Sequence, residues 1–152
     1  MKFFIFIILV FFDFLSKKLI KNFIDYNEFI SLNFFLDITH IHNYGISFGL
    51  FSGFFSSQLI VFISIIIVIL IFFWMQKSVN YIEKWGFLLI ISGAISNIGD
   101  RAINNFVLDF IFLHYKDFYW PAFNFADIYI SIGVLIIIVE SLKILKRDKK
   151  LK

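Results

Sequence analysis

Four stretches of the chain are almost wholly apolar, and more polar segments separate them. A helix that crosses a bilayer needs about 20 mostly apolar residues. The stretches at 3–23, 57–75, 85–103 and 125–145 have about that length, although the first is polar in its second half. The pattern predicts an all-α membrane protein with four transmembrane helices and a single domain, residues 1–152.

Basic residues predict the orientation of these helices. Lys77 and Lys84 lie in the short loop between the second and third helices, Lys2 precedes the first, and a basic tail follows the fourth. The tail cations are Lys143, Lys146, Arg147, Lys149, Lys150 and Lys152. Cytoplasmic segments are enriched in Lys and Arg, so we expect both termini in the cytoplasm. Three lysines fall on the opposite side: Lys18, Lys21 and Lys116.

Two longer connections lie on the predicted outer face. Residues 25–56 contain alternating, aromatic-rich stretches such as 31–39, a pattern that favours short strands or a segment at the membrane interface. We expect a small extracytoplasmic subdomain there, β-rich or interfacial. Residues 104–124 form the second connection and mix aromatic with charged side chains.

Composition narrows the classes of function. The chain is 61% hydrophobic and 22% aromatic, which a soluble fold of this size could not bury. The absence of Cys excludes disulfides, thiolate metal sites and a Cys nucleophile. A zinc site built on imidazoles would need nearly all of the three histidines. The apolar run 3–12 imitates a signal peptide, but charged residues follow it instead of a cleavage site, so we interpret it as a retained span.

Charged and amide side chains gather at the outer ends of the predicted helices. Such residues in membrane spans are costly and usually mark function. The group comprises Asp13, Lys17, Asn43, Asn97, Asp100, Arg101, Asp109, Asn124 and Asp127. Because these residues come from separate parts of the chain, the topology predicts that they converge on one membrane face.

Several of these residues also have purely structural interpretations. Asp13 and Lys17 are four positions apart, so they can pair on one helix face, either as a structural ion pair or in contact with substrate or lipid headgroups. Arg101 could brace carboxylates through bidentate bonds, or extend toward water from a span end. Asn124 could cap the fourth helix, with Asp127 at its third position.

Among the reactions that these groups could catalyse, the sequence provides the most residues for one that uses two carboxylates. When two aspartates lie close together, one keeps its proton, so the ionised one can activate water while the other protonates a carbonyl oxygen. The sequence has neither a nucleophile-elbow serine nor the H-E-x-x-H of metalloproteases. From the residues alone, a carboxylate enzyme, a small transporter and a structural or assembly protein all stay open.

Five blocks, taken in order, resemble the lipoprotein signal peptidases. They read D-F-L-S-K at 13–17, N-Y-G-I-S-F-G at 43–49, S-G-A-I-S-N-I-G-D-R at 92–101, V-L-D-F-I at 107–111 and W-P-A-F-N-F-A-D at 120–127. Ser92 and Ser96 stand where that family usually has Gly, and Gly99 where a larger apolar residue is common. Both serines are small, so we expect close packing of the third helix to survive.

The resemblance implies an aspartic endopeptidase, signal peptidase II, in the bacterial cytoplasmic (inner) membrane. It implies that Asp109 and Asp127 are the catalytic pair. It implies supporting or substrate-binding roles for Asn97, Arg101, Asn124, Asn43, Asp13, Lys17 and Asp100. The substrates would be prolipoproteins cut just before a Cys that carries diacylglycerol, with no metal or cofactor. We expect a monomer in contact with membrane lipid and not with nucleic acid. The alternative is a non-enzymatic transporter or assembly factor that uses the same charges.

Overall fold

The computed structural model describes residues 1–46 and 54–150, with side chains up to residue 143. Its elements follow the order α1 (Lys2–Phe23), β1 (Phe29–Asn33), β2 (Leu36–Asn43), α2 (Ser57–Lys77), α3 (Tyr81–Asn104), β3 (Val107–Tyr115), β4 (Phe118–Tyr119) and α4 (Phe125–Lys150). Residues 47–49 of the second family block lie outside the described part, as do the side chains of most tail cations.

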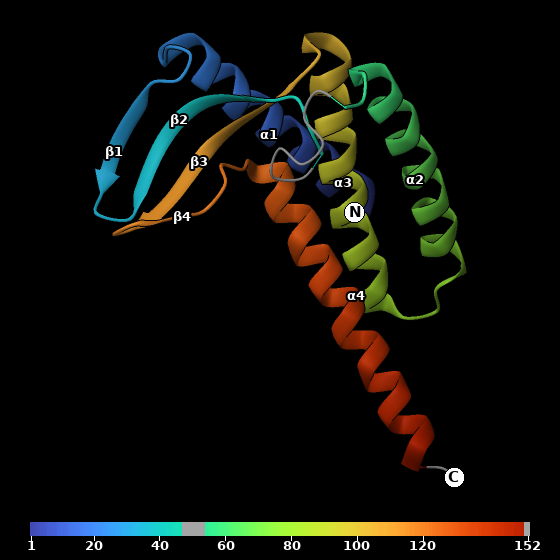
Figure 1. Ribbon diagram of the computed structural model, residues 1–152. Helices are drawn as coiled ribbons and strands as arrows, with labels where there is room; N and C mark the ends of the chain where they lie inside the picture. The colour runs from blue at the N-terminus through green and yellow to red at the C-terminus, as the bar shows by residue number, and fades with distance from the viewer. Residues whose placement is uncertain (47–53, 151–152) are drawn as a thin grey trace.

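The helices form where the apolar runs predict them, and local signals mark their ends. Ser56 caps α2 by accepting a hydrogen bond from the Leu59 backbone N–H, and Asn80 caps α3 in the same way. α3 ends at Asn104, and the next residue, Asn105, has a φ of 65°, the left-handed conformation that often terminates helices. Figure 1 shows α3 between α2 and α4, with α4 extending away toward the C-terminus.

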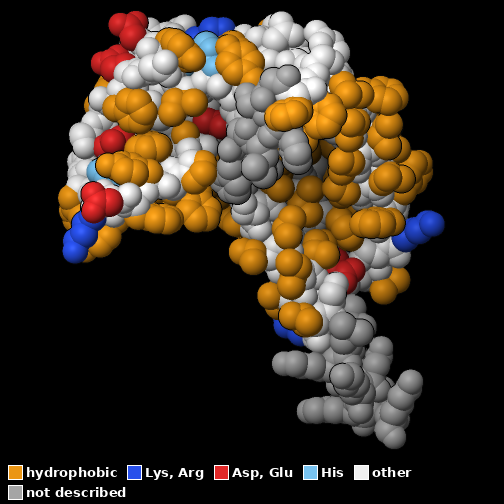
Figure 2. Space-filling model, in the orientation of Figure 1, with side chains coloured by type: hydrophobic (Ala, Val, Ile, Leu, Met, Phe, Trp, Pro, Cys, Tyr) orange, Lys and Arg blue, Asp and Glu red, His pale blue; other side chains and the backbone are white. Residues whose placement is uncertain are grey.

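Within the described residues, three helices are long and apolar enough to cross a bilayer: Ser57–Lys77, Tyr81–Asn104 and Phe125–Lys143. Large hydrophobic side chains are exposed along α1, α2 and α4 and at the two ends of α3, and Figure 2 shows them covering much of α2. α1 is not among these candidate spans, because its second half carries Asp13 and three lysines. The chain is therefore a mainly helical, multi-pass membrane protein.

One four-stranded antiparallel sheet, in the order β1-β2-β3-β4, lies beside the helices at one end of the molecule (Figure 1). The strands expected within 25–56 are present as β1 and β2. The prediction was incomplete, however, because β3 and β4 come from the second connection, which we did not assign to strands. β2 pairs with β3 so that Ile41 lies opposite Asp109 and Asn43 opposite Val107.

Candidate active site

Asp109 and Asp127 come together because a short segment ties the start of α4 to β3. Asp109 lies on β3, and Ile111 of that strand exchanges two backbone hydrogen bonds with Phe123, of 2.8 and 3.0 Å. Asn124 follows directly and begins α4, which carries Asp127 in its first turn. Two aspartates that are distant in sequence thus share one site.

Asn124 links the two aspartates through its single side chain. Its Oδ1 accepts a hydrogen bond from the Asp127 backbone N–H at 3.0 Å, and Asp127 Oδ2 accepts one from the Asn124 backbone N–H at 3.2 Å. This reciprocal pair is a capping box, so the expected capping role of Asn124 is confirmed. The same side chain donates from Nδ2 to Asp109 Oδ1 at 2.6 Å.

Asp109 is a buried carboxyl with a partner on each oxygen. It is 2% exposed, and Asn43 Nδ2 donates to its Oδ2 at 2.9 Å. Asn43 reaches it because the β2–β3 register makes the two residues diagonal neighbours on one sheet face. Burial, and then the charge of Asp127, raise the pKa of Asp109 to about 7, although the bonds from Asn43 and Asn124 favour the carboxylate. Asp109 can therefore keep its proton up to about neutral pH.

Asp127 faces a cavity with mostly apolar walls. Its Oδ1 accepts a hydrogen bond from Asn97 Nδ2 of α3 at 2.9 Å, and this bond holds the carboxyl group against α3. The cavity has a volume of about 230 Å³. Its lining is Trp120, Phe123, Asp127, Ile128, Ser131, Ile132 and Leu135. A mostly apolar molecule can therefore occupy this cavity and place a polar bond at its end next to the Asp127 carboxyl.

Asp13 and Lys17 form the predicted ion pair, with 2.8 Å between Lys17 Nζ and Asp13 Oδ2. Asp13 is fully buried, and it also accepts hydrogen bonds from Ser96 Oγ at 2.6 Å and from the Ala126 backbone N–H at 2.8 Å. These bonds join α1, α3 and α4, which favours the structural interpretation of Asp13. Lys17 also donates to Asn97 Oδ1 at 2.8 Å, so it supports the amide that holds Asp127.

In the described part of the chain Arg101 forms no ion pair with a carboxylate, which speaks against the first of its two interpretations, and at 8% exposure it does not extend toward water either. Its guanidinium donates to the backbone carbonyl oxygens of Asn43 and Gly45. Arg101 therefore holds the end of β2, from which Asn43 reaches Asp109. Its positive charge still lies close enough to the aspartates to interact with them electrostatically.

Asp100 connects α3 to the beginning of β3. Its Oδ2 accepts a hydrogen bond from the Leu108 backbone N–H at 2.8 Å, and its Oδ1 accepts one from Asn104 Nδ2 at 2.7 Å. Lys17 Nζ lies 3.6 Å from Asp100 Oδ2. Asp100 thus positions the residue immediately before Asp109 rather than contacting the pair.

The three departures in the third block have different consequences. Ser92 donates back to the Leu88 carbonyl oxygen within α3, and Ser96 donates to Asp13. The sequence reasoning missed this role of Ser96, although a buried Asp13 needs donors and could have suggested one. A side chain on Gly99 would meet no described atom within 4 Å, so small size at that position serves no helix packing.

Known proteins match nearly the whole length of the chain. The model of the signal peptidase (SPase) II family matches residues 5–143. A lipoprotein signal peptidase of Thermodesulfovibrio yellowstonii is 36% identical over 139 residues, covering 91% of this chain and 92% of that protein. One from Wigglesworthia glossinidia brevipalpis is 41% identical over 130 residues, covering 83% and 84%.

A solved structure also matches, one described as a bacterial membrane enzyme. It shares 30% sequence identity with a TM-score of 0.86, and the match covers 93% of this chain and 87% of that one. Sequence and fold agree over the same length, and the resemblance of the five blocks is confirmed. The chain belongs to the signal peptidase II family.

Proposed function

We propose that Asp109 and Asp127 are the catalytic carboxyls of an aspartic peptidase that removes signal peptides from prolipoproteins. The activity is that of the family to which the chain belongs. The observation that carries the residue assignment is the bridge by Asn124. Its side chain donates to the Asp109 carboxyl and accepts from the Asp127 backbone N–H, and its backbone N–H donates to the Asp127 carboxyl.

The chemistry requires one proton shared by the pair. The ionised carboxylate takes a proton from water, whose oxygen attacks the scissile carbonyl carbon, while the protonated carboxyl gives its proton to the carbonyl oxygen. Collapse of the tetrahedral intermediate breaks the C–N bond, and the proton taken from water goes to the leaving amine. The proton of the intermediate's hydroxyl returns to the pair, which regains its starting state. A pKa of about 7 for Asp109 keeps this proton available at neutral pH.

Three asparagines keep the pair in place for this chemistry. Asn43 and Asn124 each donate to Asp109, and Asn97 donates to Asp127. Lys17 and Arg101 act through these asparagines: Lys17 binds the Asn97 side chain, and Arg101 binds the backbone carbonyl oxygen of Asn43. Their proposed role is positioning, and Asp13 and Asp100 hold the helices and strand behind them.

The substrate we infer is a prolipoprotein with diacylglycerol on its lipobox Cys, cut just before that Cys. The apolar cavity beside Asp127 supports this substrate class. Acyl chains stay in lipid because moving each CH₂ to water costs about 0.8 kcal/mol. The enzyme would therefore bind the lipidated Cys at the depth where it lies in the membrane.

We further propose that α1 is a fourth span, that residues 1–152 form one peptidase domain, and that the site lies near the outer face. Lys77, the last residue of α2, and Lys84, in the first turn of α3, support cytoplasmic termini. The ion pair of Asp13 and Lys17 is turned inward, so the exposed side of α1 is largely Phe, Ile and Leu. The monomeric state and the independence from metal stay predictions.

A direct test compares one prolipoprotein with and without prior lipidation, using the purified protein in one detergent. We expect cleavage just before the Cys of the lipidated form, much slower cleavage of the bare form, and no loss with EDTA. Equal rates for both forms would contradict the lipid requirement. Loss with EDTA and recovery with zinc would contradict the carboxylate mechanism.

A further inference from the structure

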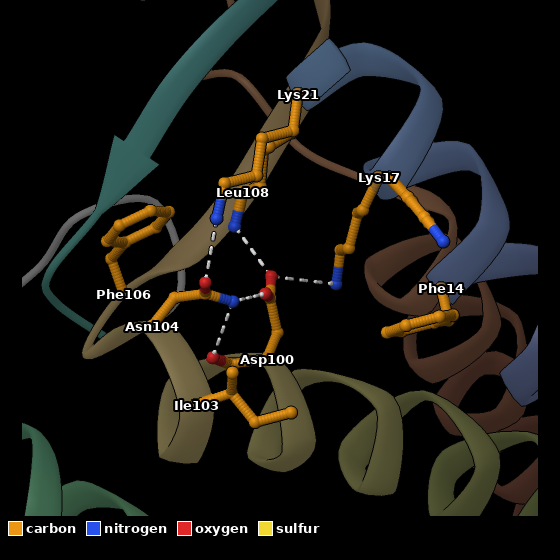
Figure 3. Close-up of a pocket in the computed structure, with 9 residues that line it drawn as sticks. Phe14, Lys17, Lys21, Asp100, Ile103, Asn104, Phe106 and Leu108 are labelled. Carbon is orange, nitrogen blue, oxygen red and sulfur yellow. Dashed lines mark hydrogen bonds and ion pairs between the residues drawn. The ribbon is translucent and has the colours of Figure 1, made fainter.

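A cationic pocket lies at the C-terminal end of α1, and it shares no lining residue with the cavity at Asp127. It has a volume of about 240 Å³ between α1, the end of α3 and the start of β3. Figure 3 shows Lys17 and Lys21 pointing into it from α1, with Asp100 and Asn104 on the opposite wall. Its lining is Phe14, Lys17, Lys18, Lys21, Asp100, Ile103, Asn104, Phe106 and Leu108.

The pocket has more positive charge than its own residues neutralise. Lys17 is paired with Asp13 and lies near Asp100. Lys21 instead donates to the neutral Asn104 amide at 2.9 Å and lies 6.0 Å from the Phe106 ring centroid. Among the described residues, neither Lys18 nor Lys21 forms an ion pair with a carboxylate. The pocket is therefore complementary to an anion.

An apolar groove continues from this pocket along the helices. It lies between α1 and α3, has a volume of about 400 Å³, and shares Phe14, Asp100 and Ile103 with the pocket. The rest of its lining is Phe6, Ile7, Val10, Phe11, Ile95, Ser96 and Gly99. Gly99 keeps the groove open, because no described atom lies within 4 Å of where its side chain would begin. The groove suits a hydrocarbon chain parallel to the helix axes.

The predicted orientation of the helices does not explain why Lys18 and Lys21 lie at this end of the molecule. Lys84, in the first turn of α3, and Asn104, which contacts Lys21, lie roughly 30 Å apart along α3 at 1.5 Å per residue. Lys18 and Lys21 are thus at the opposite end of the bundle from Lys84, where the bias toward cytoplasmic cations predicts few. A negatively charged ligand at that end would account for them.

We propose that the pocket and groove bind one anionic glycerophospholipid of the membrane. Its phosphate lies between Lys18 and Lys21, and one acyl chain lies in the groove along α1 and α3. Charge complementarity selects the headgroup, and the continuous apolar groove selects a lipid over free phosphate. The site is separate from the cavity at Asp127, so the proposal does not depend on the roles given to the two aspartates.

Photoreactive lipids test this site in the intact protein. The wild-type chain is placed in phosphatidylcholine nanodiscs with a small fraction of phosphatidylglycerol, or of phosphatidylcholine, carrying a photoreactive group. We expect phosphatidylglycerol to label residues 11–21 and 99–108 more strongly than phosphatidylcholine does. Lys18→Gln with Lys21→Gln should reduce that labelling about fivefold for each lysine removed.

Control variants separate the site from general charge. Lys77→Gln with Lys116→Asn removes the same charge elsewhere, and Asn suits the left-handed backbone at Lys116 (φ 52°). This pair should keep wild-type labelling. Gly99→Leu should fill the groove and reduce labelling, while Gly99→Ala should not, and thermal unfolding confirms that each variant is folded.

Three results would overturn the proposal. They are equal labelling by the two lipids, wild-type labelling of the Lys18 and Lys21 double variant, or wild-type labelling of Gly99→Leu. Labelling abolished by an excess of uncleavable lipidated prolipoprotein would instead assign the groove to the acyl chains of the substrate.

Discussion

At the residue scale, Asn124 combines a structural and a chemical role in one side chain. Its Oδ1 caps α4 through Asp127, and its Nδ2 binds Asp109. It is fully buried, so neither bond competes with water. The orientation of one amide therefore sets both the start of a helix and the spacing of two carboxyl groups.

Asn124→Ser should separate these two roles. Ser is as good an N-cap as Asn, so α4 should keep its start and the protein should still fold, at a melting temperature lowered only by the loss of the bond to Asp109. The lost bond to a charged group is worth about 1.5–3 kcal/mol, so kcat should fall about 10- to 100-fold. Measurement of kcat and thermal unfolding on one preparation checks both. A variant that keeps wild-type kcat would show that this bond does not position Asp109.

The pH profile should report the shared proton of the pair. Burial and Asp127 raise the pKa of Asp109 to about 7. Above that pH the pair loses the proton that it must donate, so kcat should decline as pH rises through about 7. Hydrogen bonds from Asn43 and Asn124 favour the carboxylate, so their removal raises the pKa, and Asn124→Ser should move this decline to higher pH. A decline that moves to lower pH would contradict the account.

Most site residues could be predicted from sequence, but their partners could not. The five blocks indicate which aspartates and asparagines belong to the site, and the four-residue spacing predicts the ion pair between Asp13 and Lys17. For Arg101 the sequence left two interpretations open, bracing carboxylates or extending toward water, yet it is buried and binds backbone carbonyls of Asn43 and Gly45. Those contacts join positions about 60 residues apart, so only the folded chain determines them.

At the element scale, close packing of α3 on α4 brings the Asp127 segment to Asn97. A side chain on Gly93 would overlap the Ala126 carbonyl oxygen, one residue before Asp127, and would crowd Ile130. Gly133 of α4 packs against α3 in the same way, close to Gly86. Small residues of this kind let membrane helices approach closely.

Gly93→Ala should therefore destabilise the protein by about 1–3 kcal/mol through overpacking, and should lower activity by displacing Asp127. Gly99→Ala lies in the same helix, where the added carbon meets no described atom. It should be neutral or stabilise the protein by up to about 1 kcal/mol. Thermal unfolding and cleavage rates check both, and equal behaviour of the two variants would contradict the packing argument.

Long apolar runs predicted the helices well, but the sheet only in part. A run of about 20 apolar residues allows few structures in a membrane. β3 is different, because its first four residues are all buried and do not alternate in polarity. Such a strand cannot be distinguished from other apolar segments by periodicity, and its partner β2 lies far away in sequence.

At the scale of the whole molecule, the proposed fourth span is α1. Its 22 residues span about 33 Å, enough for a bilayer. Asp13 and Lys17 would cost little there, because they are buried against α3 and α4 and bind each other. Four spans would place both termini on one side, with the sheet on the other.

Reporter fusions test this arrangement. A reporter after Lys152 should be active only if it requires the cytoplasm, and one inserted in the β1–β2 turn, between Phe34 and Phe35, should be active only outside it. Both turn residues are exposed, so the insertion should not disturb folding. An external signal from the C-terminal fusion would reverse the orientation and the proposed location of the site.

The central claim is that neither Asp109 nor Asp127 can be spared, and single-site variants test it most directly. Asp109→Asn and Asp127→Asn are assayed on a lipidated prolipoprotein, beside Asp117→Asn in the exposed turn before β4 as a matched control. Each site variant should insert and fold yet show no detectable cleavage, because one carboxyl activates water and the other donates the proton. The Asp117 control should cleave at the wild-type rate. Unreduced cleavage by either Asp109→Asn or Asp127→Asn would contradict the account.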